Sequence, residues 1–356
     1  MHRAGPSYWR LRLAKWAPAG PAREGYTLLV PVPGDIPVFL RLALAVCRFQ
    51  QSGSRVETVV VPDALTQPMR DIVAAARADW PGELRLQPLP PPERWALPRL
   101  GDPGRNHALQ LVTGVSCSRA THVVLHDADL FLLEPDVLES QFRHCRDQGL
   151  ACLGTSPPWD PWYAEHGRHL AATWELCART DWLRRYPPFS HMAHEEELFG
   201  ERHMFDTTFY PQALTAPELI AVRPVEALVH FNYVISNYRK FLRRGGEGWH
   251  DRSFRLLLVC LLVELFDPEG APSYRVPALG QLACYLGDAS APVQLPAAAE
   301  GVAEYAAFRE LLERALSGPW AAGGQQELAR AVLGPFDSFY AYAGEAVAPP
   351  TSRPGG

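Results

Sequence analysis

The sequence predicts an α/β fold in which helices flank a mostly parallel central sheet. Through most of the chain, short apolar runs alternate with longer segments of helical periodicity. The apolar runs carry hydrophobic side chains at consecutive positions, which is typical of strands buried on both faces. Successive runs are separated by enough residues for a crossover helix, and this spacing favours parallel pairing.

The pattern assigns the elements in order. Strands are expected at residues 26–32, 56–62, 84–90, 121–126, 150–154 and 219–231. Helices are expected at residues 36–50, 69–80, 106–116 and 136–148, and an acidic helix start at residues 191–203. The prolines and glycines of residues 90–104 predict a loop. Together these elements predict one large domain over residues 25–240.

Both ends of the chain depart from this alternation. Residues 1–24 lack clear periodicity and predict an N-terminal arm. Three helical patterns, at residues 251–266, 297–316 and 325–333, predict a helical extension over residues 241–343, and residues 344–356 predict a disordered tail. The apolar faces of the three helices could pack on the large domain or form a homodimer interface, and the sequence leaves both open.

Composition narrows the class of protein. The net charge of -5 and the isoelectric point of about 6.2 argue against a nucleic-acid partner. Seven cysteines, odd in number and without a CxxC pair, favour a reducing compartment. The N-terminus has no long apolar segment, and the apolar run at residues 256–266 is too short to be transmembrane. We expect a cytoplasmic protein, with peripheral membrane contact through the Arg- and Trp-bearing N-terminus as the alternative.

Two acids, Asp127 and Asp129, interrupt the apolar run THVVLHDADLFLLEP. A buried carboxylate without a partner is costly, and a second like charge adds to that cost. In α/β sheets ligands bind at the carboxyl ends of strands, and an i, i+2 pair on extended chain lies on one side. Mn²⁺ or Mg²⁺ would keep both carboxylates ionised and could bridge a diphosphate. The alternative is a pair of solvated turn acids.

Five segments form an ordered series along the chain. They are LLVPVPGD at residues 28–35, VVVPD ending at Asp63, GDPGRNHAL with Arg105 and Asn106, HDADLFLLEPDVLE with the acid pair, and HEEELFGER with Glu195, Glu196 and Arg202. In this order the chain resembles the nucleotide-sugar glycosyltransferases of the GT-A fold, particularly the family 2 group, over residues 26–238. The ordered set is more specific than any single motif.

The resemblance implies a GT-A catalytic domain and a role for each segment. Asp63, Arg105 and Asn106 would face the nucleotide of a nucleotide-diphosphate sugar. Asp127 and Asp129 would bind the cation and the donor diphosphate. His230, which ends the apolar segment EALVHF, would complete the cation site, with a purely structural histidine as the alternative.

The resemblance also implies a general base. An inverting transfer needs a carboxylate that takes the proton of the acceptor hydroxyl while the nucleoside diphosphate leaves from the opposite face. Glu196 matches this position, with Glu195 beside it as a second catalytic candidate. The alternative is that HEEEL is the acid-rich first turn of a helix, where negative charge is favourable.

Aromatic residues between the acid pair and HEEEL predict an acceptor site. The aromatic residues offer flat faces for sugar rings, and the acids among them offer carboxylates for hydroxyl groups. They are Trp159, Trp162, Tyr163 and Trp174, with Asp160 and Glu175. The alternative for these aromatic residues is core packing. The acceptor itself is not specified by the sequence.

Two departures from the family pattern leave the nucleobase open between UDP, GDP and dTDP donors. VPVPGD lacks the usual Tyr-Asn pair, and VVVPDAL lacks the usual Asp-Asp-Gly-Ser.

Rival hypotheses are a phosphohydrolase of the haloacid dehalogenase type, a sugar nucleotidyltransferase and a non-catalytic sugar-nucleotide-binding protein. The residues after Asp129 do not match the pattern of the haloacid dehalogenase phosphohydrolases, and VPVPGDIPVF lacks the Gly-rich basic loop of a sugar nucleotidyltransferase. The intact acids count against the third.

Overall fold

The computed structural model describes residues 4–18, 20–100, 103–156, 160–224, 226–243, 253–288, 290–291, 295–296 and 299–347. The chain divides into two compact units, residues 1–228 and residues 229–356.

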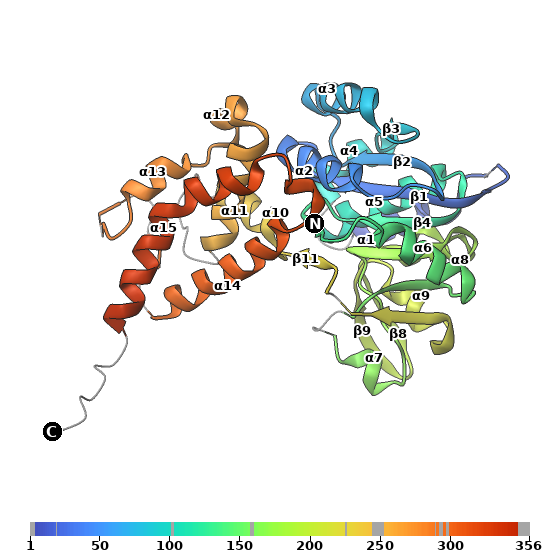
Figure 1. Ribbon diagram of the computed structural model, residues 1–356. Coiled ribbons are helices and arrows are strands. Elements are labelled where there is room, and N and C mark those ends of the chain that lie inside the picture. The colour runs from blue at the N-terminus through green and yellow to red at the C-terminus, as the bar shows by residue number, and fades with distance from the viewer. Residues whose placement is uncertain are drawn as a thin grey trace. The chain divides into compact units, whose positions relative to one another are not determined.

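The first unit is built on a seven-stranded sheet of order β10-β6-β7-β4-β1-β2-β3 (Figure 1). Its strands are β1 Arg23–Val32, β2 Arg55–Pro62, β3 Leu84–Leu86, β4 Ala120–His126, β6 Cys152–Thr155, β7 Glu175–Arg179 and β10 Ile220–Arg223. Four neighbouring pairs, β1–β2, β1–β4, β2–β3 and β6–β10, are parallel. Strand β7 runs antiparallel to β4 and to β6. The predicted α/β fold with a mostly parallel sheet is confirmed.

Helices cover both faces of this sheet. They are α2 Pro37–Arg48, α3 Gln67–Ala76, α5 Pro103–Cys117, α6 Val137–Asp147 and α8 Thr180–Arg185. Leu29 and Val123 share a core with α5 and α8. Tyr26 and His122 point to the opposite face, where their rings contact Phe142 of α6. Because both faces are covered, the strands need apolar residues at consecutive positions.

Residues 90–104, predicted to be a loop, contain helix α4 Pro91–Leu100 and the start of α5. The prediction was wrong because proline at the first positions of a helix lacks only an N–H that would be unbonded there anyway. Pro91 and Pro92 therefore begin α4 instead of preventing it.

The segment HEEEL is a strand, which corrects the predicted helix start. Strand β8 His194–Leu198 pairs antiparallel with β9 Glu201–Phe205. The two residues between them, Phe199 and Gly200, have φ values of 55° and 82°. Positive φ at both positions is the geometry of a two-residue hairpin turn. The run of glutamates before it suggests the first turn of a helix instead.

Residues 1–24, predicted to be an arm, include helix α1 Ala4–Arg12. Trp9 is fully buried, and Leu13, one turn later, belongs to the same core as α5. This corrects the expectation of an arm. Trp9 and Leu13 alone are too few to show helical periodicity in the sequence, but their burial anchors α1 on the core. Buried in this way, Trp9 is not available for a membrane surface.

Shorter elements complete the first unit. They are β5 Leu130–Leu132, α7 Trp162–Glu165, α9 Phe209–Ala213 and the start of β11 Leu228–His230. The predicted strand at residues 219–231 is thus two strands, β10 and β11, separated by residues 224–227.

The second unit is helical, as predicted for the extension. Its helices are α10 Val234–Arg243, α11 Ser253–Phe266, α12 Ala271–Tyr274, α13 Leu279–Cys284, α14 Ala299–Leu316 and α15 Gln325–Val347 (Figure 1). Tyr305 and Tyr340 stack at 4.2 Å between α14 and α15. Leu257, Leu258 and Leu261 of α11 are fully buried within the single chain. Among the described helices, none combines the length and the apolar character that crossing a bilayer requires.

His191, between α8 and β8, is a buried titratable group in the first unit. Its Nε2 lies 2.8 Å from the carbonyl oxygen of Leu183, and its ring lies edge-on to Trp16. Burial lowers the pKa of His191 to about 4, although the hydrogen bond to Leu183 opposes this shift. In the unfolded chain the pKa returns to its ordinary value near 6.5.

Between pH 6.5 and pH 4 the unfolded chain therefore binds one more proton at His191 than the folded chain does. Above this window the neutral imidazole contributes to the free energy of unfolding. As the pH falls through the window, this contribution decreases by roughly 2 to 3 kcal/mol. We expect the destabilisation caused by His191→Gln to shrink by that amount between pH 7.5 and pH 4.5, measured by urea unfolding. An unchanged difference between the two proteins would contradict the assignment.

Candidate active site

The acid pair occupies a turn at the carboxyl end of β4. The Asp127 N–H donates to the carbonyl of Trp174, and the Leu130 N–H closes the turn onto the carbonyl of Asp127. Asp127 is partly exposed and Asp129 is buried. The two acids are thus brought together by a turn between β4 and β5, and not by extended chain as the sequence analysis expected.

A buried charge pair lies directly before the acid pair. His126 ends β4 opposite Glu175, the first residue of β7, and His126 Nδ1 lies 2.9 Å from Glu175 Oε2. Both side chains are fully buried. Burial acts to lower the pKa of His126, but Cys47 and Glu175 outweigh it and hold this pKa well above its ordinary value. The carboxylate therefore faces an imidazolium, which offsets the cost of burying either charge alone.

His107, on the second turn of α5, contacts the acid pair. Its Nε2 lies 2.9 Å from Asp127 Oδ1. Burial acts to lower the pKa of His107, but Asp127, Asp206 and Asp129 together raise it above its ordinary value. The imidazole thus lies beside three carboxylates, and it holds one oxygen of Asp127 in place.

Asp127 and Asp129 each offer a carboxylate oxygen, and these two ligand atoms lie within 4.8 Å of each other. His230, the third predicted ligand, ends β11 in the second unit. Carboxylate oxygens are the ligands that Mg²⁺ and Mn²⁺ prefer, and imidazole is compatible with Mn²⁺. The chemistry of this donor set fits the predicted cation.

Of the residues expected to face the nucleotide, Asp63 has a structural bond of its own. Asp63 follows β2, and its Oδ1 accepts the N–H of Gly34 at 2.8 Å. A Cβ on Gly34 would lie 1.7 Å from the carbonyl oxygen of Ala64, so only glycine allows these two loops to approach. Arg105 and Asn106 lie in the first turn of α5, which begins three residues before the predicted helix. Asn106 Oδ1 is buried and has no hydrogen-bond partner among the described residues.

Glu196 lies on β8 with its side chain one-third exposed. Arg10 of α1 donates to Glu196 Oε2 at 2.7 Å, and His194 Nε2 lies 3.9 Å from the same oxygen. Side chains alternate along a strand, so Glu195 and Glu197 point to the other face, where Glu195 lies 3.7 Å from Arg202. Of the three glutamates, Glu196 is the one with two basic side chains, Arg10 and His194, close to one carboxylate oxygen.

The predicted acceptor residues are mostly used in packing. Trp162 is buried and stacks on His203 at 4.6 Å, within a small core that includes Phe205. Asp160 accepts from the Trp162 N–H and lies 3.1 Å from His203 Nε2. Trp174 is buried beside the acid pair, and Trp159 lies outside the described residues. For Trp162 the core-packing alternative is the one the contacts support.

Two residues at this site, His107 and Arg10, were not singled out from the sequence, and Glu175, expected to hold acceptor hydroxyl groups, is instead fully buried against His126. His107 directly follows Arg105 and Asn106 in GRNHAL, so its place in that segment was an available signal. Arg10 contacts Glu196 across 186 residues, and Glu175 contacts His126 across 49. No local pattern marks pairs so far apart.

No family model matches the chain, and no curated protein matches it. Solved structures are similar at low identity. The galactosyltransferase LgtC, in complex with donor and acceptor sugar analogs, is 8% identical with a TM-score of 0.41, over 56% of this chain and 74% of that one.

Two further structures are similar at the same level. The mannosyltransferase PcManGT from Pyrobaculum calidifontis, with GDP-Man and Mn²⁺, is 16% identical with a TM-score of 0.36, over 97% and 95% of the two chains. Glucosyl-3-phosphoglycerate synthase from Mycobacterium tuberculosis, with Mn²⁺, UDP and phosphoglyceric acid, is 13% identical with a TM-score of 0.39, over 64% and 81%. Similarity at this level does not assign a function to this chain.

Removing one partner of the buried charge pair should be strongly destabilising. We expect Glu175→Ala to lower the free energy of unfolding by about 3 to 5 kcal/mol, because it leaves the His126 imidazolium buried without its counter-charge. The double variant His126→Leu with Glu175→Leu is the matched control and should recover part of this loss. Urea unfolding at pH 7 measures both, and a loss below about 1 kcal/mol for Glu175→Ala would contradict the pairing.

Proposed function

We propose that the protein is a metal-dependent glycosyltransferase that moves a sugar from a nucleotide-diphosphate donor to an acceptor hydroxyl or amine. The observation that carries the proposal is the pair of carboxylates Asp127 and Asp129, whose ligand atoms lie within 4.8 Å of each other at the carboxyl end of a central strand. Ligands of α/β sheets bind at such strand ends. The ordered motifs from residue 26 to residue 238 support the same class.

Asp127, Asp129 and His230 are the residues that would hold Mn²⁺ or Mg²⁺. When bound, the cation would supply positive charge to the diphosphate leaving group. His107 holds Asp127 by its Oδ1. The Asp127 N–H is also held, by the Trp174 carbonyl. The chain thus fixes this carboxylate before any ligand arrives, which is the condition for electrostatic preorganisation.

Glu196 is proposed as the general base of an inverting transfer. It is partly exposed, so an acceptor hydroxyl can reach it, and Arg10 orients one of its two oxygens. Glu195 is not proposed for this role, because its side chain lies on the opposite face of β8. The hydroxyl proton would pass to Glu196 as the oxygen attacks the anomeric carbon.

Asp129→Ala should abolish turnover and leave the fold intact. The variant removes one ligand of the proposed cation, so we expect nucleoside diphosphate release from a panel of nucleotide sugars to fall by roughly a thousandfold or more. The fold should survive, because the substitution removes one charge from a repulsive pair. The matched control is Asp147→Ala, an exposed acid of α6 that pairs with Arg146.

Two measurements complete this experiment: Mn²⁺ binding by electron paramagnetic resonance and thermal unfolding by circular dichroism. A variant that unfolds would favour a structural role for Asp129. If no donor gives metal-dependent release with the native protein, the glycosyltransferase proposal fails, and a non-catalytic sugar-nucleotide-binding protein becomes the better hypothesis.

Glu196→Gln should lower kcat by roughly 10²- to 10⁴-fold without changing donor affinity, because a general base acts on the acceptor only. Glu197→Gln, one position along β8 on the opposite face, is the matched control and should remain near the native rate. Arg10→Gln removes the ion pair but keeps the Glu196 carboxylate, so it separates the contribution of the ion pair to kcat from that of the carboxylate.

The stereochemistry of the product tests the same assignment. Direct attack by an acceptor activated by Glu196 inverts the anomeric carbon, so NMR coupling constants of the product should show the configuration opposite to that of the donor. A product of retained configuration would exclude Glu196 as the base of a single displacement.

A further inference from the structure

A pocket of about 500 Å³ lies at the β3 edge of the sheet. It is lined by Leu65, Arg70, Val73, Ala74, Arg77, Leu86, Pro88 and Arg94. These residues come from α3 and the segments beside it, from β3 and the residues after it, and from α4. None of them belongs to the candidate active site. The volume lies within the range of small-molecule sites.

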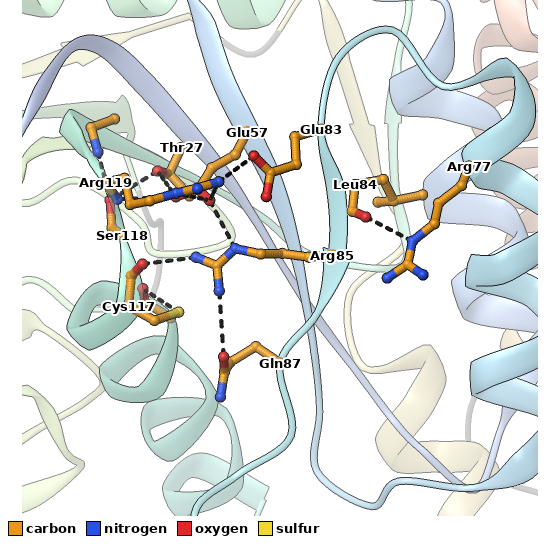
Figure 2. Close-up of polar contacts among 12 residues, drawn as sticks. Thr27, Glu57, Arg77, Glu83, Leu84, Arg85, Gln87, Cys117, Ser118 and Arg119 are labelled. Atoms are coloured by element: carbon orange, nitrogen blue, oxygen red, sulfur yellow. Dashed lines mark hydrogen bonds and ion pairs between the residues drawn. The ribbon is translucent and has the colours of Figure 1, made fainter.

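Three of the lining residues are arginines: Arg70, Arg77 and Arg94. All three are exposed. Within the part of the chain that the structure describes, none of them forms an ion pair with a carboxylate. Arg77 donates its Nε to the carbonyl oxygen of Leu84, which leaves both terminal nitrogens of the guanidinium available (Figure 2).

The acids on the same elements are bonded to other groups. Asp71 accepts from Gln67, Asp79 from Arg48, and Glu93 pairs with Arg12. Glu83, next to β3, pairs with Arg119. Three of these four acids are therefore paired with arginines that do not line the pocket, whereas Asp71 is bonded, among the described residues, only to a neutral amide.

Arg85 shows the contrast on the opposite face of β3. It donates to Glu57, a fully buried carboxylate that also accepts from Arg119, while Arg77 extends to the other side of the strand (Figure 2). The Arg85 guanidinium on one side of β3 is thus paired with a carboxylate, whereas the three arginines of the pocket form no ion pair among the described residues. Like charges gathered around one pocket repel each other, and an anion bound among them relieves that repulsion.

The other lining residues have apolar side chains. Leu65, Val73, Leu86 and Pro88 supply a hydrophobic wall next to the arginines. Guanidinium groups bind phosphate through two parallel hydrogen bonds, and an apolar wall favours a ligand with a flat or hydrophobic part.

We propose that the pocket formed by α3, β3 and α4 is a second binding site, which takes a phosphorylated small molecule whose apolar part rests on Leu65, Val73 and Leu86. This site is separate from the one that Asp127 and Asp129 form, and it requires no divalent cation. The proposal does not depend on the glycosyltransferase function.

The test uses phenyl phosphate, which carries a phosphate and a flat apolar ring but no nucleobase. Binding to the full chain is measured by isothermal titration calorimetry in EDTA, so that no cation can hold the phosphate on the acid pair. Inorganic phosphate and benzyl alcohol are the two partial probes. We expect phenyl phosphate to bind more tightly than either, because it engages both the arginines and the apolar wall.

Arg70→Gln and Arg94→Gln should each weaken phenyl phosphate roughly tenfold, and the double variant should abolish binding. Both arginines are exposed, so the variants should fold, which circular dichroism checks. The matched control is Arg146→Gln, an exposed arginine of α6 whose loss should have no effect. The proposal is overturned if phenyl phosphate does not bind at millimolar concentration, if the double variant still binds it, or if Arg146→Gln weakens it equally.

Discussion

The buried pair of His126 and Glu175 joins the two strands on which the candidate site is built. Strand β4 lies between β1, to which it is parallel, and β7, to which it is antiparallel, and the register of β4 with β7 sets His126 opposite Glu175. Because both charges are fully buried, neither residue can leave the pair without exposing the other to an apolar surrounding. The end of β4, and with it Asp127, is held at that point.

The same principle of charge balance recurs through the first unit. Asp127 is matched by His107, Glu196 by Arg10, and Glu57 by Arg85 and Arg119. In each case the partners come from segments distant in the chain, so the balance exists only once the fold has formed. The three arginines of the α3–β3–α4 pocket have no carboxylate partner of this kind among the described residues, and their gathering around one pocket is what points to a ligand.

The N-terminal helix shows how packing and chemistry become linked. Burial of Trp9 fixes α1 on the core, and this places Arg10 on the outer side of the same helix against Glu196. A segment without clear periodicity thus contributes a contact to the candidate general base. The β8–β9 hairpin supplies the other half, since its two-residue turn determines which glutamate faces Arg10.

The sequence by itself determined the fold class, the strands β1, β2 and β4, and the acid pair at a strand end, because burial on both faces and a sudden polar pair are local patterns. Tertiary structure decided the rest. The turn that brings Asp127 and Asp129 together, the hairpin that orients Glu196, and the contacts of Arg10, His107 and Glu175 depend on residues far apart in the chain. Secondary-structure propensity depends on residues that are neighbours in the sequence, whereas these ion pairs form between residues that only the packed fold brings together.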